Sequence, residues 1–352
     1  MTDKKEAIDR IISFVKENDN FLLIYHLDTD GITSAVLVSI ALSRLGKTIS
    51  SYKPANYEDF KDMDISSYPD NVIVCDMQIR KEILPVFNGK RLCIIDHHEL
   101  DTSSTQNYIN PKMWGDMSYR PCALVAYLVF KEFLSEEEWI AAIGTVGDSG
   151  GKDNRDFLLE AAGKAGVAIG KDEYLYDTEF GTAAEMIGDM TTRYGRAGAE
   201  EALGILLISG SLKDILENPR LMSAKKTVDI EIKKLKEAFE LHAEKPLKNL
   251  IIFELDPKYR RYSSTLITSI SFDKKYYGNI IVFMTMIKDG LLRLNLRANG
   301  VEIRLPEVLR EIFQKIKGEG GGHDKASGGT IKEKDKDEVK KLLIEAVKRR
   351  LY

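Results

Sequence analysis

The sequence predicts an α/β protein of two domains, in which a parallel sheet with flanking helices forms the first. Its 352 residues suit about two domains of the usual 100–200 residues. Three short apolar runs alternate with helical patterns, which is typical of parallel strands covered on both faces. Each run ends on aspartate or histidine, so we expect a functional site at one edge of the sheet.

The elements of the first domain follow from the spacing of apolar residues. This spacing predicts a helix over 4–18 and a second helix over 33–45, which Gly46 stops. The continuous apolar runs predict central strands over 21–25, 72–75 and 92–95. From about 123 to 210 the chain is expected to form helices joined by turns.

A charged helix over 224–245, closed by Pro246, is expected to join the two domains. Beyond it, strands of a second α/β domain are expected over 250–253, 280–284 and 291–297. A terminal amphipathic helix follows Lys334. We therefore place the first domain at 1–220, the linker helix at 221–246 and the second domain at 247–352.

Composition and charge exclude several classes of protein. The longest apolar run, 35–42 with Ser39 inside it, is far short of the ~20 residues that cross a bilayer. Because no secretory signal opens the chain, we expect a cytoplasmic protein with no membrane contact. The three cysteines have neither zinc-knuckle nor redox-pair spacing, which indicates reduced core residues. A net charge of −4 argues against a protein that coats long duplex DNA.

Polar side chains from separate segments are expected to meet at the carboxyl edge of the sheet. They are His26, Asp28, Asp30, Asp76, Asp96, His97 and His98, with Asp148 at the end of an apolar helix. Ligands of open α/β sheets bind beyond the carboxyl ends of the strands, so these segments deliver carboxylates and imidazoles to one place. A lone Asp-His-His tripeptide could be a surface turn, but four ordered segments that all end apolar elements favour a site.

Carboxylates and imidazoles without a thiolate favour Mn²⁺ or Mg²⁺ over a structural zinc, and Mn²⁺ is our expectation. Asp28 and Asp30 stand two apart, so each is expected to serve a different metal, with Asp76 as the bridge. Two such ions hold a phosphate and lower the pKa of a bound water, which is the chemistry of phosphoester hydrolysis. His98 is the candidate acid–base residue.

The second domain offers a possible phosphate-binding surface. The strand over 291–297 alternates, so its leucines face the core while Arg293, Asn295 and Arg297 share the other face. Glycines over 318–322, followed by His323, would let backbone N–H groups approach a phosphate, and an arginine can grip it with two hydrogen bonds. The alternatives are a surface turn for the glycines and a solvated face for the arginines.

These residues resemble the DHH phosphoesterase family. The set His26-x-Asp28-x-Asp30-Gly31, Asp76, Asp96-His97-His98 and Gly147-Asp148 is similar to its four ordered motifs. Gly320-Gly321-Gly322-His323 is similar to the signature of its DHHA1 substrate domain. The resemblance covers nearly the whole chain. It implies a parallel-sheet DHH domain, a smaller α/β DHHA1 domain and an active-site cleft between them.

Carried over by position, the resemblance implies a role for each site residue. One metal is implied to bind His26, Asp28 and Asp76, and the other Asp30, Asp76, His97 and Asp148. Asp96 is implied to support the ligands without touching a metal, and His26 could instead buttress its loop. Arg297, Gly321, Gly322 and His323 are implied to bind a substrate phosphate or terminal nucleotide. The metals would be Mn²⁺, with Mg²⁺ or Co²⁺ as alternatives.

Similarity to the RecJ-like and nanoRNase-like branches implies a single-strand-specific exonuclease on DNA or RNA, with 3′→5′ polarity and nucleoside monophosphate products. The compact layout resembles archaeal members such as the Hef-associated nuclease, which implies repair, replication or RNA turnover beside a helicase partner. An alternative is a small-nucleotide phosphodiesterase or phosphatase acting on a cyclic dinucleotide, nanoRNA or 3′-phosphoadenosine 5′-phosphate. A non-catalytic Cdc45-like scaffold is a third reading, which the intact motifs oppose. An exposed apolar stripe on either charged helix would serve homo-oligomerisation.

Overall fold

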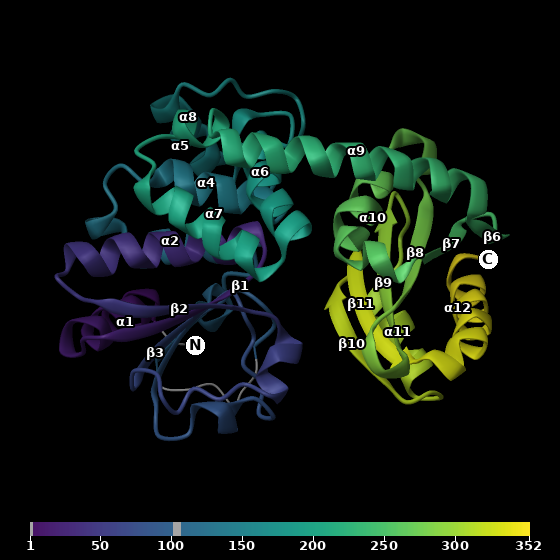
Figure 1. Ribbon diagram of the computed structural model, residues 1–352, viewed down its shortest axis with the longest axis horizontal. Helices are drawn as coiled ribbons and strands as arrows, with labels where there is room; N and C mark the ends of the chain where they lie inside the picture. The colour runs from purple at the N-terminus through teal and green to yellow at the C-terminus, as the bar shows by residue number, and fades with distance from the viewer. Residues whose placement is uncertain (1–2, 101–106) are drawn as a thin grey trace. The chain divides into compact units, whose positions relative to one another are not determined.

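The computed structural model describes residues 3–100 and 107–352 (Figure 1). The chain divides into two compact units, Met1–Lys225 and Lys226–Tyr352, each built around its own sheet. The expected α/β fold, with a parallel sheet in the first part of the chain and a second sheet after it, is confirmed. Within the described ranges, no helix is long and apolar enough to cross a membrane.

The sheet of the first unit has five parallel strands in the order β2-β1-β3-β4-β5. The strands are β1 (Phe21–His26), β2 (Ile49–Ala55), β3 (Asn71–Cys75), β4 (Arg91–Ile95) and β5 (Asn107–Ile109). The three expected central strands are β1, β3 and β4, and they are direct neighbours in the sheet. Their carboxyl ends therefore lie side by side at one edge, where the polar residues follow them.

Eight helices of the first unit lie in the described residues. They are α1 (Lys4–Glu17), α2 (Thr29–Arg44), α3 (Cys122–Val129), α4 (Glu138–Gly147), α5 (Arg155–Ala165), α6 (Glu179–Tyr194), α7 (Arg196–Ile208) and α8 (Leu212–Leu216). The helices cover one face of the sheet in a single large core. The other face is covered by loops and short 3₁₀ turns rather than by the α-helices that the sequence favoured.

The second unit contains a mixed six-stranded sheet in the order β10-β11-β9-β8-β7-β6, in which β7 and β8 are parallel. The strands are β6 (Glu244–Leu247), β7 (Leu250–Leu255), β8 (Asn279–Met286), β9 (Leu291–Asn299), β10 (Gly318–His323) and β11 (Ala326–Lys332). The helices α11 (Leu305–Phe313) and α12 (Lys336–Leu351) pack on one face. The helices α9 (Pro219–His242) and α10 (Ser263–Ser271) pack on the other.

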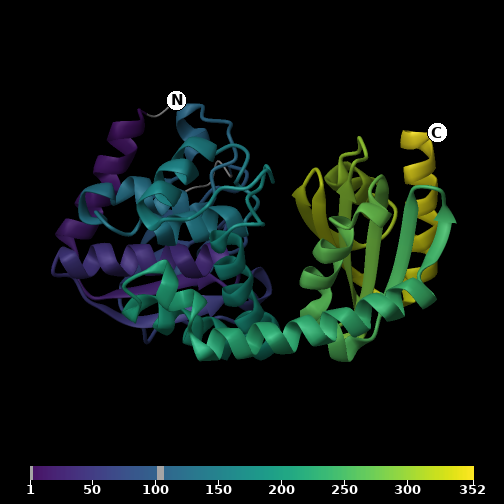
Figure 2. The ribbon, with the colours of Figure 1, turned by 90° about the horizontal axis from the view of Figure 1, so that it is seen from above.

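Helix α9 runs unbroken from the first unit into the second (Figure 2). Leu221 and Ala224 pack in the core of the first unit, whereas residues from Val228 onward pack in the second. The helix begins at Pro219, because proline is tolerated in a first turn. It ends at His242, so the expectation that Pro246 closes it is wrong: Pro246 lies in the edge strand β6.

The glycine-rich segment is an edge strand, β10, and not a surface turn. It pairs antiparallel with β11, with Gly321 opposite Gly328 and His323 opposite Ala326. Gly322 has φ +136°, and a Cβ there would lie 2.5 Å from the carbonyl oxygen of Ala326. A Cβ on Gly321 would instead point into open space. Strand β10 therefore requires glycine at Gly322, whereas Gly321 faces open space that a side chain could fill.

Candidate metal centre

The strand ends of the first unit place Asp76 and the residues after β4 next to one another. Asp76 follows β3 directly with φ +61°, a left-handed conformation that aspartate tolerates better than most residues. Its N–H donates to the carbonyl oxygen of Ile95 on the neighbouring strand at 3.0 Å. Asp96, which follows β4, donates its N–H to Ile109 in the same way at 3.1 Å. Both turns are thus fixed by the sheet itself.

The first turn of α2 supplies two carboxylates. The helix begins at Thr29, earlier than the expected residue 33, because Asp28 caps it by accepting from the Gly31 N–H at 2.9 Å. The Asp30 side chain is buried and accepts from the N–H groups of Cys122 at 2.6 Å and Ala123 at 2.8 Å. These amides begin α3, so the positive end of that helix faces Asp30.

Asp148 reaches the site from the carboxyl end of α4. The Tyr119 hydroxyl donates a hydrogen bond of 2.6 Å to its Oδ2 atom. The end of a helix carries partial negative charge, which disfavours a carboxylate there. Asp148 therefore depends on donors or cations from elsewhere.

Two clusters of possible ligands meet at Asp76. In the first, Nδ1 of His26 lies 2.8 Å from Oδ2 of Asp28 and 3.5 Å from Oδ2 of Asp76. In the second, Nε2 of His97 lies 3.2 Å from Oδ1 of Asp76, 3.6 Å from Oδ2 of Asp148 and 3.9 Å from Oδ2 of Asp30. Each oxygen of Asp76 thus faces a different histidine, as a bridging carboxylate requires.

A third group contains His98. Its Nδ1 lies 2.7 Å from Oδ1 of Asp96, whose carboxylate is fully buried and also accepts from the Tyr108 hydroxyl at 3.4 Å. Ligating atoms of Asp76, His97 and His98 lie within 4.8 Å of one another. His98 can therefore face the same centre while Asp96 orients its ring.

The carboxylates of this centre repel one another in a buried environment. Burial, followed by repulsion from Asp76 and other carboxylates, raises the pKa of Asp30 well above its usual range. Burial likewise raises the pKa of Asp148 to about 6, against the influence of His97. The pKa of Asp76 is lowered instead, because hydrogen bonds and charge from His26 and His97 outweigh its burial. Divalent cations would relieve the repulsion.

An atom without a partner supports the same conclusion. Within the described residues, the buried Nδ1 atom of His97 makes no hydrogen bond. Buried polar atoms are otherwise nearly always paired. Oxygen and imidazole donors in this arrangement fit two hard or borderline divalent cations.

The predicted substrate residues share one face of the second sheet. Arg297 on β9, Ala326 on β11 and His323 on β10 stand opposite one another in a row. In the next row but one, Asn295, Gly328 and Gly321 stand opposite one another; the Arg293 guanidinium lies over Gly328, whereas Gly321 faces open space. Gly322 pairs with Ser327, in a row whose side chains point to the opposite face of the sheet. Gly322 can therefore contribute only its backbone to the face that carries Arg297 and His323. The structure thus brings Arg297, Gly321 and His323 to one face.

The face is not simply solvated, as the alternative reading held. Asn295 Nδ2 donates to Oγ of Ser263 at the start of α10 at 3.0 Å. Arg293 Nη1 lies 3.4 Å from Oγ1 of Thr330 on β11. Both side chains are half-buried and held in place.

Tyr119 and Tyr108 were not foreseen at the metal centre, because neither belongs to a recognisable motif.

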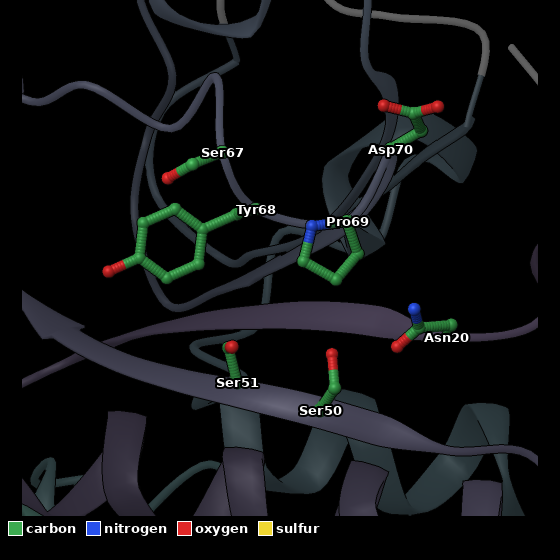
Figure 3. Close-up of a pocket in the computed structure, with 7 residues that line it drawn as sticks. All are labelled: Asn20, Ser50, Ser51, Ser67, Tyr68, Pro69 and Asp70. Atoms are coloured by element: carbon green, nitrogen blue, oxygen red, sulfur yellow. The ribbon is translucent and has the colours of Figure 1, made fainter.

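A hollow of about 660 Å³ opens away from this centre (Figure 3). Its lining residues precede or begin the strands β1, β2 and β3, and so lie at the amino edge of the sheet: Asn20, Ser50, Ser51, Ser67, Tyr68, Pro69 and Asp70. The metal centre lies at the carboxyl edge. The hollow is therefore separate from the candidate metal centre.

Comparison with known families accounts for both units. Residues 20–145 match the model of the DHH family N-terminal domain, and residues 263–349 match that of the DHHA1 domain, together more than half of the chain. The chain belongs to the DHH/DHHA1 phosphoesterases. It is accordingly a metal-dependent phosphoesterase, and the structure supplies acidic and histidine clusters that suit divalent metals. The comparison with curated proteins found no match.

Solved structures share the fold of this DHH/DHHA1 chain. RecJ of Thermus thermophilus in complex with Mn²⁺ has a TM-score of 0.76 at 18% identity, covering 98% of this chain and 54% of that one. The chain thus spans about half the length of that RecJ. An exonuclease RecJ bound to manganese has a TM-score of 0.68 at 18% identity, covering 97% and 94%. A pGpG-specific phosphodiesterase, PggH from Vibrio cholerae, has a TM-score of 0.52 at 16% identity, covering 94% and 99%.

Proposed function

We propose that this phosphoesterase is a two-metal exonuclease specific for single strands of DNA or RNA. The observation that carries the proposal is the meeting of two ligand clusters at Asp76. The proposed first metal site consists of His26, Asp28 and Asp76, and the second of Asp30, Asp76, His97 and Asp148. Mn²⁺ is the proposed metal, supported by the oxygen and imidazole donors and by the manganese in two RecJ structures of the same fold.

Each side chain has a defined task in this proposal. Bound divalent cations supply a Lewis acid and a water of lowered pKa close to the scissile phosphate. Asp76 holds both sites in register. His98 is oriented by Asp96, whose carboxylate, against the effect of burial, raises the pKa of the imidazole to about 9. His98 is proposed to donate a proton to the departing oxygen.

The second unit is proposed to bind the substrate. Arg297 and His323, which share one row of the sheet, offer hydrogen-bond donors to a phosphate near the open backbone of Gly321. Because glycine has no Cβ, a ribose or base can approach the backbone closely at that position. The backbone of Gly322 is proposed to contribute to the same binding site. The near-neutral charge of the chain suits such a local grip better than binding along a duplex.

Finer properties of the proposal come from the resemblance. They are 3′→5′ polarity, release of nucleoside monophosphates, a role in repair, replication or RNA turnover, a helicase partner, a homo-oligomeric state and a cytoplasmic location. A second candidate is a phosphodiesterase of short or cyclic nucleotides, which the fold shared with the pGpG-specific enzyme favours. A non-catalytic scaffold is opposed by the presence of every proposed ligand in one place.

Hydrolysis of labelled substrates in Mn²⁺ would decide between the two enzymes. Single-stranded DNA and RNA labelled at either end are incubated beside pGpG, a cyclic dinucleotide and 3′-phosphoadenosine 5′-phosphate. Stepwise ladders are expected, and the label released first gives the polarity. Cleavage of the small nucleotides alone would support the second candidate. Asp76→Asn is expected to abolish turnover of every substrate, and near-normal turnover by this variant would overturn the two-metal assignment.

A further inference from the structure

Tyr119 touches two proposed ligands of the second metal without being a ligand itself. Its hydroxyl donates to Oδ2 of Asp148 at 2.6 Å. Its ring meets the His97 imidazole edge-on, with 5.3 Å between the ring centroids. Oδ2 of Asp148 is also the oxygen 3.6 Å from Nε2 of His97. The three side chains therefore form one continuous contact.

The backbone of Tyr119 is fastened to the loop that follows Asp148. Its N–H donates to Oδ2 of Asp153 at 2.8 Å, and its carbonyl oxygen accepts from Nδ2 of Asn154 at 2.8 Å. Asn154 is itself buried and donates to Gly150 within the loop at 2.7 Å. We call the contacts of Tyr119 with Asp148, Asp153 and Asn154 the tyrosine clasp. The clasp joins the segment that contains Tyr119 to the segment that follows α4 and contains Asp148, which lies 29 residues further along the chain.

Asp148 has a particular need for such a contact. It stands at the carboxyl end of α4, where the helix offers carbonyl oxygens rather than N–H donors. The Tyr119 hydroxyl supplies a hydrogen-bond donor to the Asp148 carboxylate from outside that helix. Asp30, by contrast, accepts from two backbone amides, so its orientation is set by α3. Without the clasp, the Asp148 carboxylate would rotate away from His97 more readily.

We propose that Tyr119 is a positioning residue for the second metal site. Its hydroxyl holds the Asp148 carboxylate, and its aromatic ring holds the His97 imidazole. The inference rests on the ligand sets proposed above. Groups that orient metal ligands in this way typically contribute about 10–100-fold in metal affinity. The substitution Tyr119→Phe tests the contribution of the hydroxyl while the ring is kept.

Binding of Mn²⁺ alone, measured by calorimetry on the full metal-free chain, tests the proposal without any substrate. Tyr119→Phe keeps the ring and deletes the hydroxyl, so one Mn²⁺ equivalent is expected to bind at least about tenfold more weakly while the other is unchanged. Tyr176→Phe is the matched control, because its hydroxyl lies 2.6 Å from Oγ of Ser149, one residue beyond Asp148. This variant is expected to bind both equivalents like the wild type.

Asp148→Asn distinguishes failure of the positioning role from failure of the ligand sets. If this variant binds two equivalents with wild-type affinity, the ligand sets are wrong and the role of Tyr119 fails with them. If it loses one equivalent while Tyr119→Phe binds both normally, the ligand sets stand and the positioning role is refuted. An equal loss in Tyr119→Phe and Tyr176→Phe also refutes it, because general loosening of the loop would explain both. Excess Mn²⁺ is expected to restore the kcat of Tyr119→Phe.

Discussion

Gly144 lies where α2, α3 and α4 meet, and replacing it with alanine is expected to destabilise the DHH unit. A Cβ there would lie 2.2 Å from Oγ1 of Thr33 and 2.4 Å from Cβ of Ala123. Carbon atoms in contact are normally about 3.5–4.0 Å apart, so α3 and α4 would have to separate by about 1 Å. Neither neighbouring side chain can turn aside, since Ala123 has no side-chain torsion and the Thr33 hydroxyl donates to Thr29 at 2.7 Å.

The expected cost follows from two contributions. Overpacking of a well-packed core costs about 1–3 kcal/mol. A shift of α3 would also stretch the 2.8 Å hydrogen bond from Ala123 to Asp30, and a bond to a charged group contributes about 1.5–3 kcal/mol. The free energy of unfolding is therefore expected to fall by about 3–5 kcal/mol. With a urea m-value of about 1–3 kcal/mol per molar, the midpoint would fall by more than about 1 M.

Tryptophan fluorescence during urea unfolding reports this unit alone, because both tryptophans, Trp114 and Trp139, lie within it. Gly204→Ala is the matched control. Gly204 is exposed in α7, and its Cβ would meet nothing within 4 Å, so alanine is expected to stabilise by about 0.5–1 kcal/mol. A Gly144→Ala protein with the midpoint of the wild type would refute the reasoning about helix contact.

Three further predictions concern the two sites. Gly321→Ala is expected to leave the Tm unchanged but to raise KM severalfold, because the added Cβ enters the surface proposed to bind substrate. An unchanged KM would contradict substrate binding at this surface. Gly322→Ala is expected to lower the Tm, because φ +136° and the nearby carbonyl exclude a side chain, as thermal unfolding would show. Metal-free protein is expected to lose stability as the pH rises from about 4 to 6. Burial raises the pKa of Asp148 from 3.8 to about 6, so over this range the folded form holds a proton that the unfolded form has lost. Added Mn²⁺ should reverse this slope, and thermal unfolding in EDTA that improves from pH 4 to 6 would contradict it.

The sequence was informative where local pattern and topology agree. Continuous apolar runs identified β1, β3 and β4, and the rule that parallel strands end at one edge correctly predicted that Asp76 and His97 lie close together. The edge strand β2 was not foreseen, because the segment Ile49–Ala55 alternates exposed and half-buried residues and contains lysine and proline. Edge strands face water on more sides, so they lack the apolar run that reveals a central strand.

The contacts of Tyr119 and the contact surface of Gly144 were beyond sequence reasoning for a different reason. Both depend on how loops and helices far apart along the chain approach each other, which no local spacing encodes. The start of α2 shows an intermediate case: apolar spacing placed it at residue 33, whereas the cap formed by Asp28 starts it at Thr29. Polar residues in a first turn are invisible to an apolar pattern but are fixed by hydrogen bonding.

Helix α9 has a consequence for attempts to dissect this protein. Leu221 belongs to one hydrophobic core and Val228 to the other, so a cut between them keeps both cores but divides the helix that contributes to each. A fragment ending at Lys225 would lack the helical continuation of its last turn, and one beginning at Lys226 would have to nucleate a frayed helix. Separate expression of the units therefore calls for Pro219–His242 on both fragments, with polar substitutions where each copy exposes the other unit's apolar stripe.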